Sequence, residues 1–410
     1  MRELGPGYVS EIDAVNEGTW WEILEEFDDA NIYQTWSYAV VRYGRQHTSH
    51  LVLKEKGEIV AAAESRITRV PFLDVGVAYI RWGPLWRLRN AEAKEERFRQ
   101  AIRALRNEYV CTRGLVLRLF PMLFDSDAPR FLSILEEEGF SRVGQETWHQ
   151  TILVDLTRSL RDLRQGLRQH WRRGLNAAER NRLEVVEGHG DELFETFIRI
   201  YREMASRKGL AGFSSINELR AIQGLLPEKF KMKIMLCRSG DDLCAGLVCS
   251  AMGKTAIYLL GATSNSGMKS RGTYLLHWKL IEGLKRDPRV TVYDLNGVNP
   301  KTNAGMYRFK NDLSGENGRH AYVLGRFDSH PNVLSCSWVA CGDTLRAIYR
   351  ALWENGRARL ALLDPRRRDR ALAGEEHHAG HGHRRDGTDD HREAPARASG
   401  RFSPPAEPDE

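Results

Sequence analysis

The chain has 410 residues, of which 41% are hydrophobic and 28% charged, and this fits a soluble protein of two domains with additional segments. Its formal net charge of +6 suits a polyanionic partner such as RNA, a phosphate or a membrane surface, although general solubility explains it equally well. The six cysteines form no CxxC pair and show no zinc-ligand spacing. The sequence has no signal-peptide pattern and no apolar stretch approaching the ~18 residues of a membrane span, so we expect a cytoplasmic protein.

The first clear pattern is at residues 50–67 (HLVLKEKGEIVAAAESRI), where two short apolar segments flank a charged turn that contains glycine. This arrangement predicts a β-hairpin. Another strand pattern follows at 75–80, then a helical period at 91–108, and then a strand pattern at 114–119. The sequence therefore predicts a hairpin, a strand, a helix and a strand, in this order.

The same five elements recur further along the chain. A hairpin pattern at 233–252 (KIMLCRSGDDLCAGLVCSAM) is followed by a strand pattern at 255–262, a helical period at 271–286 and a strand pattern at 290–295. A strand–glycine–strand pattern is common by itself. The shared order of five elements, however, indicates two copies of one α/β unit.

Between the two copies, residues 149–155 predict a strand and residues 159–184 predict one long amphipathic helix. Apolar residues at spacings of three and four give this helix a stripe that we interpret as a core face. A parallel stripe, one residue further on, consists of Arg161, Arg164, Arg168 and Arg172. Both a solvated face and a surface that binds a polyanion explain the arginines.

The common catalytic motifs are missing, namely the GxSxG nucleophile turn, the P-loop, the HExxH zinc motif and a GxGxxG that follows a strand. Residues 261–274 (GATSNSGMKSRGTY) link a strand to a helix, and their glycines, with Lys269 and Arg271, could surround an anion at the helix N-terminus. A plain flexible connection explains these residues almost as well. Tyr258 and Tyr274 flank the segment and are expected either in a cleft or in the core.

Residues 293–310 (YDLNGVNPKTNAGMYRFK) join a strand end to a turn-rich connection. The strand brings Asp294 and Asn296 to its end, where polar side chains of an α/β sheet commonly line sites. Lys310 is a cation that can stabilise the oxyanion formed when an amine attacks an ester or thioester. Phe309 beside it offers a stacking face. On these grounds the segment is one candidate site among several.

The last part of the chain has a different composition. From residue 365 on, Pro, Gly, Arg, Asp and His dominate and apolar periodicity stops. Such a composition cannot bury a core, so we expect residues 365–410 to be disordered. The histidines of this tail fit a solvated tail and also a metal-binding tract; they are His377, His378, His381, His383 and His391.

The segment YDLNGVNPKTNAGMYRFKNDLSG resembles the closing motif of the FemABX family, the non-ribosomal peptidyl transferases that form peptidoglycan bridges. In that family a Tyr-Asp strand, a glycine-rich turn and a Phe-Lys pair recur in this order. Three other segments resemble family motifs in their order along the chain. They are QTWSYAVVRYG, which contains Arg42, HWRRGLNAAERNRLEVVEG, which contains Arg172, and IYREMASRKGL, which contains Arg207.

The resemblance implies an α/β fold of two tandem GNAT-like (acyl-CoA N-acyltransferase-like) domains, with mixed sheets flanked by helices. This agrees with the internal repeat. We predict a first domain at residues 1–155, completed by residues 321–362, and a second domain at residues 156–320. The disordered tail at residues 365–410 follows.

The resemblance also implies an aminoacyltransferase that moves an amino acid from an aminoacyl-tRNA to an amine of a lipid-linked or UDP-linked cell-wall precursor. Such a protein would act in peptidoglycan synthesis, and hence in cell wall biogenesis and cell shape, without a metal or CoA. Lys310 would aid the transfer and Phe309 would meet the tRNA end, while Arg42 and Arg207 would contact phosphates of the precursor. We expect a monomer, with peripheral contact to the inner membrane face as an option.

The remaining candidate residues lie around the same segment. Asp294 is the carboxylate to test as a catalytic group, and Tyr258, Tyr293 and Asn296 are expected to bind substrate. Two departures from the family pattern leave the acceptor open. Arg42 replaces the usual lysine, and Phe120 stands where some members have an aspartate that grips the precursor.

Two other functions remain open at this stage. A CoA-dependent N-acyltransferase of the GNAT class would bind its donor at the 261–272 loop. A non-catalytic module would bind RNA or an envelope polymer through the arginines of residues 158–182.

Overall fold

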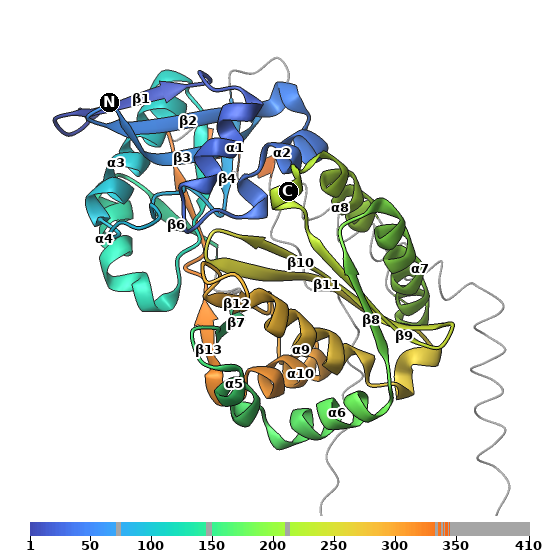
Figure 1. Cartoon of the computed structure of the whole chain (residues 1–410). Helices are drawn as coiled ribbons and strands as arrows, with labels where there is room; N and C mark the ends of the chain where they lie inside the picture. Colours follow the sequence, from blue (N-terminus) through green and yellow to red (C-terminus); the bar gives the residue numbers. More distant parts are fainter. Residues whose placement is uncertain are drawn as a thin grey trace, which may run out of the picture. The chain divides into compact units, whose positions relative to one another are not determined.

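The computed structural model describes residues 1–344 apart from positions 71–74, 145–149, 210–213, 333, 334, 338, 340 and 343. The predicted disordered tail at residues 365–410 lies outside this described part. Met1–Pro331 form one compact unit. This unit contains two seven-stranded sheets, each flanked by helices (Figure 1).

The first sheet has the strand order β1-β2-β3-β4-β5-β14-β6. Only β4 and β5 pair in parallel, and all other neighbours are antiparallel. Its hairpin turns at Lys56 and Gly57, whose φ values of 52° and 94° are those of a tight two-residue turn. The strands are β1 (Tyr8–Ile12), β2 (Thr48–Glu55), β3 (Glu58–Arg69), β4 (Gly76–Arg81), β5 (Val116–Phe120), β6 (Ser141–Val143) and β14 (Arg326–Ser329).

The second sheet has the order β13-β7-β12-β11-β10-β9-β8. Again a single pair, β11 and β12, is parallel, and the others are antiparallel. The strands are β7 (Gln150–Asp155), β8 (Glu184–Gly188), β9 (Lys233–Ser239), β10 (Asp242–Met252), β11 (Thr255–Thr263), β12 (Val292–Asp294) and β13 (Gly318–Tyr322). We call each sheet with its own helices the first and the second half.

The helices begin and end at residues suited to these positions. The side chain of Asn16 accepts a hydrogen bond from Thr19 N (2.9 Å) at the start of α1, and Thr35 Oγ1 accepts one from Tyr38 N (3.2 Å) in α2. Gly209, with a φ of 65°, ends α7. The helices are α1 (Glu17–Glu25), α2 (Trp36–Tyr43), α3 (Glu95–Leu105), α4 (Ala128–Glu137), α5 (Leu160–Gly166), α6 (Gln169–Arg180), α7 (Asp191–Lys208), α8 (Ser214–Leu225), α9 (Gly272–Leu284) and α10 (Ala304–Ser314).

The predicted repeat is confirmed. In the first half β2, β3, β4, α3 and β5 follow one another, and in the second half β9, β10, β11, α9 and β12 do the same. The chain changes sheet twice near the predicted joints. β7, which the prediction placed in the first domain, lies between β12 and β13 of the second sheet, and β14 returns to the first sheet. The division into two domains stays a prediction, because both halves belong to one compact unit.

A shared hydrophobic core joins the two halves. Successive residues of a strand face opposite sides of its sheet. In β9, Met235 and Cys237 face a core under α6, α9 and α10, whereas Ile234 and Leu236 face another core. That second core contains side chains from both halves, among them Trp20, Phe27 and Ile32 from the first and Phe194 and Phe197 from the second. The first half has a further core of its own beneath α3 and α4.

The single long helix predicted for residues 159–184 is wrong. The structure has two helices, α5 and α6, separated at Leu167 and Arg168, whose ψ values of 139° and 148° are extended. The reason is a close approach that the local pattern does not reveal. Gly166 packs directly against Asn317 and Gly315, and Arg168 N donates to Asp312 O (3.0 Å). From Leu163 on the apolar stripe faces the core, as expected, whereas Leu160 at its start is 37% exposed.

Candidate functional site

The site begins at the end of β12 with Asp294, which is 1% exposed. Its carboxylate accepts hydrogen bonds from Thr151 Oγ1 on β7 and from the backbone of Asn296 (N to Oδ1, 2.7 Å). The second bond forms a tight turn in which Asn296 takes a left-handed conformation with a φ of 61°. Burial raises the pKa of Asp294, against the opposing effects of Thr151, the Asn296 amide and Lys310.

Lys310 reaches the same turn from α10, which Asn303 caps by accepting from Met306 N (3.1 Å). Its Nζ donates to the carbonyl oxygens of Gly297 (2.9 Å) and Asn296 (3.3 Å), and the residue is 5% exposed. Burial lowers the pKa of Lys310 to about 8, although the charge of Asp294 acts in the opposite direction. The two ionisable groups therefore meet at one turn, and their pKa values are shifted toward each other.

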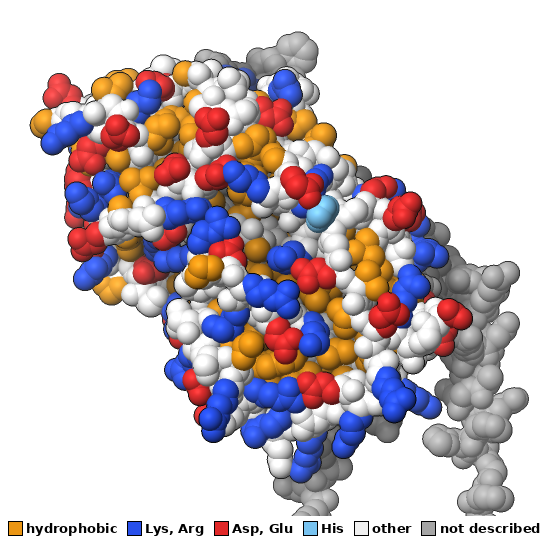
Figure 2. Space-filling model, viewed as in Figure 1, with side chains coloured by type: hydrophobic (Ala, Val, Ile, Leu, Met, Phe, Trp, Pro, Cys, Tyr) orange, Lys and Arg blue, Asp and Glu red, His pale blue; other side chains and the backbone are white. Residues whose placement is uncertain are grey.

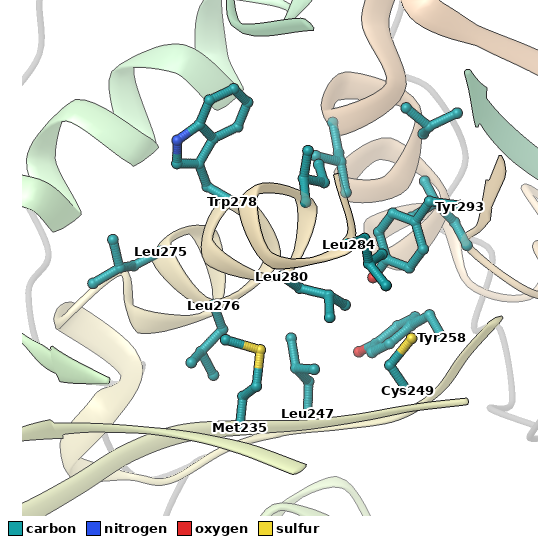
Figure 3. Packing of buried hydrophobic residues seen from close by; sticks show 14 of the residues in the cluster. Met235, Leu247, Cys249, Tyr258, Leu275, Leu276, Trp278, Leu280, Leu284 and Tyr293 are labelled. Carbon is teal, nitrogen blue, oxygen red and sulfur yellow. The ribbon is translucent and has the colours of Figure 1, made fainter. Parts of the chain in front are cut away.

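The ring of Tyr258 lies beside the ammonium group, and further aromatic rings pack in the same core. Lys310 Nζ lies 5.5 Å from the ring centre of Tyr258, and the ring of His277 is 5.4 Å from that of Phe309. His277 Nδ1 and Tyr293 Oη are 2.9 Å apart. Figure 3 shows Tyr258 and Tyr293 in the layer of buried side chains beneath α9. Tyr258 and Tyr293 are thus core residues beside the site, and Phe309 packs against the same core.

A cavity of about 50 Å³ lies where the two halves meet, and Asp294 is in its wall. The walls come from β4, β5 and neighbouring loops of the first half and from β7 and the β12 turn of the second. Phe120, the residue that replaces the aspartate of the family pattern, is one of them. Lys310 does not line the cavity. Its ammonium group, however, donates to two carbonyl groups of the turn that forms part of the wall. The lining residues are Tyr33, Arg81, Trp82, Phe120, Met122, Phe124, Gln150, Thr151, Asp294, Asn296, Gly297 and Val323.

The structure thus brings together six of the eight predicted site residues, Lys310, Asp294, Asn296, Phe309, Tyr258 and Tyr293. Arg42 and Arg207 are elsewhere. Arg42 on α2 pairs with Glu218 of α8, and Arg207 on α7 donates to Thr263 O (2.8 Å) and to Asn265 Oδ1. Neither arginine lines the cavity.

Sequence reasoning missed the contribution of the first half to the site, above all Arg81 and Gln34. Gln34 Nε2 donates to the carbonyl oxygens of Arg81 (2.8 Å) and Glu64 (3.3 Å), and its Oε1 accepts from Glu64 N (2.9 Å). This amide links Glu64 in the middle of β3 to Arg81 at the end of β4, and Arg81 lines the cavity. One signal was available, because Arg81 ends a strand whose pattern is otherwise apolar.

The 261–272 loop is closed by its own side chains. Gly267 N donates to Ser264 Oγ (2.8 Å) and Gly272 N to Ser270 Oγ (3.0 Å), so two of its N–H groups already have partners. A separate groove of about 510 Å³ lies between α6, β8 and α9. Both acidic and basic side chains line it, and it contains none of the predicted site residues. Within the described part of the chain, no cluster of His, Cys, Asp or Glu could hold a metal ion. No helix among those residues is long and apolar enough to span a membrane.

The comparison with known proteins first defines the class. Residues 161–311 match the family described as acetyltransferase (GNAT) domain, and this stretch contains β8–β12 with α9. The repeated order of strands and helix in the two sheets makes the chain a tandem GNAT-like α/β protein, as predicted. The chain therefore has the GNAT acyltransferase fold.

The particular likeness is to the crystal structure of FemX. It has a TM-score of 0.66 and 13% sequence identity, and the match covers 78% of this chain and 97% of that one. A conserved protein of unknown function from Bacteroides thetaiotaomicron VPI-5482 has a TM-score of 0.52 and 8% identity, over 78% of this chain and 100% of that one. No curated protein matches the chain. At such identities the likeness establishes the fold, and the resemblance seen in the sequence is confirmed at that level.

Proposed function

We propose that the protein transfers an amino acid from an aminoacyl-tRNA to an amine of a peptidoglycan or other cell-envelope precursor in the cytoplasm. The observation that supports this best is the meeting of Asp294 and Lys310 at one turn in the wall of a cavity enclosed by both halves. A carboxylate of raised pKa and an ammonium of lowered pKa are the acid–base groups that amine acylation needs near neutral pH.

In the proposed reaction the amine nitrogen attacks the ester carbonyl carbon of the aminoacyl-tRNA. A carbon–nitrogen bond forms, and the bond from that carbon to the ribose oxygen breaks. Asp294 accepts the proton that the amine loses, and this proton then passes to the departing oxygen. The charge of Lys310 stabilises the negative charge that develops at this end of the cavity, and its two hydrogen bonds hold the turn in place.

Charge on the second half is consistent with an RNA co-substrate. Arg161, Arg168, Arg173 and Arg180 on and beside α5 and α6 are exposed and make no ion pair within the described part of the chain. Figure 2 shows Lys and Arg side chains gathered in the lower part of the view, where Figure 1 has α6. Such a surface suits the phosphates of a tRNA. Phe309 would meet the tRNA end, and Arg42 and Arg207 would exchange their present partners for phosphates of the precursor.

Transfer of a labelled amino acid from charged tRNA to UDP-linked and lipid-linked precursors tests the proposal. Lys310→Met and Asp294→Asn should each lower kcat/KM by about 100- to 1,000-fold, because each removes a charge that stabilises the transition state. Lys301→Met is the matched control, since Lys301 is an exposed lysine of the same loop and does not line the cavity. If no precursor is labelled, or if Lys310→Met equals the wild type, the proposal is wrong.

The CoA-dependent alternative keeps one supporting observation, which is the match of residues 161–311 to the GNAT acetyltransferase domain. The N–H groups of Gly267 and Gly272 already donate to serine side chains of the same loop, and this argues against a phosphate-binding role for residues 261–272. Transfer of a labelled acetyl group from acetyl-CoA to the same precursors, without transfer from charged tRNA, would favour this alternative.

A further inference from the structure

Arg81 is a buried cation without a matching anion. It is the last residue of β4 and is 8% exposed. Its Nη1 donates to Tyr38 Oη (2.9 Å), and its guanidinium carbon lies 4.2 Å from the ring centre of Tyr33. Arg81 makes no ion pair with any described residue, and its Nε has no hydrogen-bond partner among them. A phenol and a ring face orient this guanidinium but leave its charge uncompensated.

Burying a charge without a counter-charge is costly, and proteins keep such groups mainly where a ligand or partner supplies the opposite charge. Arg81 lines the 50 Å³ cavity, which is where a ligand would reach it. Guanidinium groups bind carboxylates especially well, because two parallel N–H groups match the two oxygens. The anion most suited to Arg81 in so small a space is therefore a carboxylate.

The rest of the cavity limits what can accompany that carboxylate. Among the lining residues Arg81 is the only cation and Asp294 the only acid, and much of the remaining wall is apolar, including Trp82, Phe120 and Phe124. An anionic group at one position and a cationic group at another fit this distribution of charge. A cavity of about 50 Å³ corresponds to roughly two water molecules, so only a small end group of a larger ligand would enter it.

We propose that the cavity is the subsite for an amino-acid end group, with its carboxylate on Arg81 and its amine facing Asp294. The acceptor class would then be an amine that carries a carboxylate on the neighbouring carbon, rather than a simple alkyl amine. This identification of the acceptor rests on the proposed function, because it takes the bound amine to be the nucleophile. The binding of the end group itself does not depend on it.

Binding of three small probes to the full chain, measured by ligand-observed NMR titration, tests the subsite. Alanine carries both groups, propionate only the carboxylate and ethylamine only the amine. Arg81→Met should weaken the binding of alanine and of propionate by about 10- to 100-fold, because a hydrogen-bonded charge pair is lost. The binding of ethylamine should be unchanged. Asp294→Asn should weaken the binding of alanine and of ethylamine and leave the binding of propionate unchanged.

Arg87→Met is the control, since Arg87 also lies on a ring, 4.8 Å from the centre of Trp86, but outside the cavity. It should bind all three probes like the wild type. If Arg81→Met does not fold, Arg81→Lys and the wild-type preference for alanine over ethylamine take its place. A wild type that binds alanine no better than ethylamine, or a folded Arg81 variant with unchanged binding of propionate, overturns the subsite.

Paired acceptors separate this inference from the proposed function. Transfer to an amine with a neighbouring carboxylate should exceed transfer to the decarboxylated analogue by at least about tenfold, and Arg81→Met should remove the difference. Equal transfer to both acceptors would overturn the assignment of the acceptor while the aminoacyl transfer itself stands. If neither acceptor is labelled but Arg81→Met still weakens the binding of alanine, the proposed function is wrong and the subsite stands.

Discussion

At the scale of single residues, the main feature is a pair of buried ionisable groups that compensate each other in part. Asp294 and Lys310 are both almost fully buried. Burial raises the pKa of Asp294 and lowers that of Lys310, so that the neutral form of each group is favoured. The charge of each group opposes the shift of the other. A lone charge at this depth would be strongly destabilising. A substitution that removes one of the two charges should therefore shift the pKa of the other group.

The pKa of Lys310 predicts how the proposed reaction depends on pH. Because that pKa lies at about 8, the ammonium form is lost as the pH rises through this value. If the ammonium is needed, kcat/KM should fall about tenfold per pH unit above 8. Lys310→Met should retain a low activity without this alkaline decline. A decline of the same size in the Lys310→Met variant would assign it to another group.

His277 predicts a pH dependence of stability. Burial and the charge of Lys310 lower the pKa of His277 from 6.5 to about 3, so the unfolded chain binds a proton between these values and the folded chain does not. The free energy of unfolding should therefore fall by about 1.4 kcal/mol per unit as the pH drops from 6.5 toward 3. His277→Asn should remove this share of the decline, because asparagine does not titrate and can still bond Tyr293.

Urea unfolding at pH 7, 6 and 5 measures the effect. His47→Asn is the control, since His47 is exposed and its replacement should leave the pH dependence unchanged. If the wild type and His277→Asn lose stability in parallel over this range, His277 does not carry the proposed proton linkage.

From the sequence we could predict which residues of one segment lie together, but not which residues of distant segments join them. Asp294, Asn296, Phe309 and Lys310 lie within 17 positions of one another in the printed sequence, and a strand end followed by turn residues marks such a group. Arg81 is far from them in the chain. Only the pairing of β4 with β5 and the packing of the two halves brings it to the same cavity, and no local pattern encodes this.

At the scale of elements, the segment between Leu160 and Arg180 shows where periodicity misleads. The apolar stripe runs through both α5 and α6, so the sequence reads as one helix. The break arises from a contact with Gly315 and Asn317, which lie about 150 positions away and cannot be seen in the stripe. Asn317 Nδ2 donates to Leu163 O (3.1 Å), which satisfies a carbonyl group at the end of α5.

This contact predicts that Gly166→Ala is destabilising even though alanine favours helices. A Cβ at position 166 would collide with the side chain of Asn317. We expect a loss of about 1–3 kcal/mol in the free energy of unfolding, because either the Asn317 bond or the packing of α5 is lost. Gly224→Ala is the control, since it lies in α8 with nothing within 4 Å of its Cβ, and it should be neutral or stabilising by about 1 kcal/mol. If urea unfolding gives the two variants the same change in the free energy of unfolding, the contact between α5 and Asn317 does not contribute to stability.

At the scale of the whole molecule, the repeat and the tandem fold could be predicted because each unit repeats its order of elements. The resemblance also implies that residues after 320 complete the first half, and β14 lies in the first sheet. The place of β7 in the second sheet could not be predicted, because so short a strand carries no sign of its partner. The shared core was also invisible, because Trp20 and Phe197 look like ordinary core residues of their own halves.

The shared core predicts that the halves unfold together. Trp20 and Phe27 of the first half pack in one cluster with Phe194 and Phe197 of the second, all four fully buried, so neither half can keep this core alone. Phe197→Ala should cost about 3–5 kcal/mol and weaken both halves equally. Hydrogen exchange of the slow amides of β3 and β10 measures this, with the exposed Val9→Ala as control. If β3 keeps its wild-type protection while β10 loses its own, the halves are separate folding domains, and the cavity between them is then an interface that opens without unfolding.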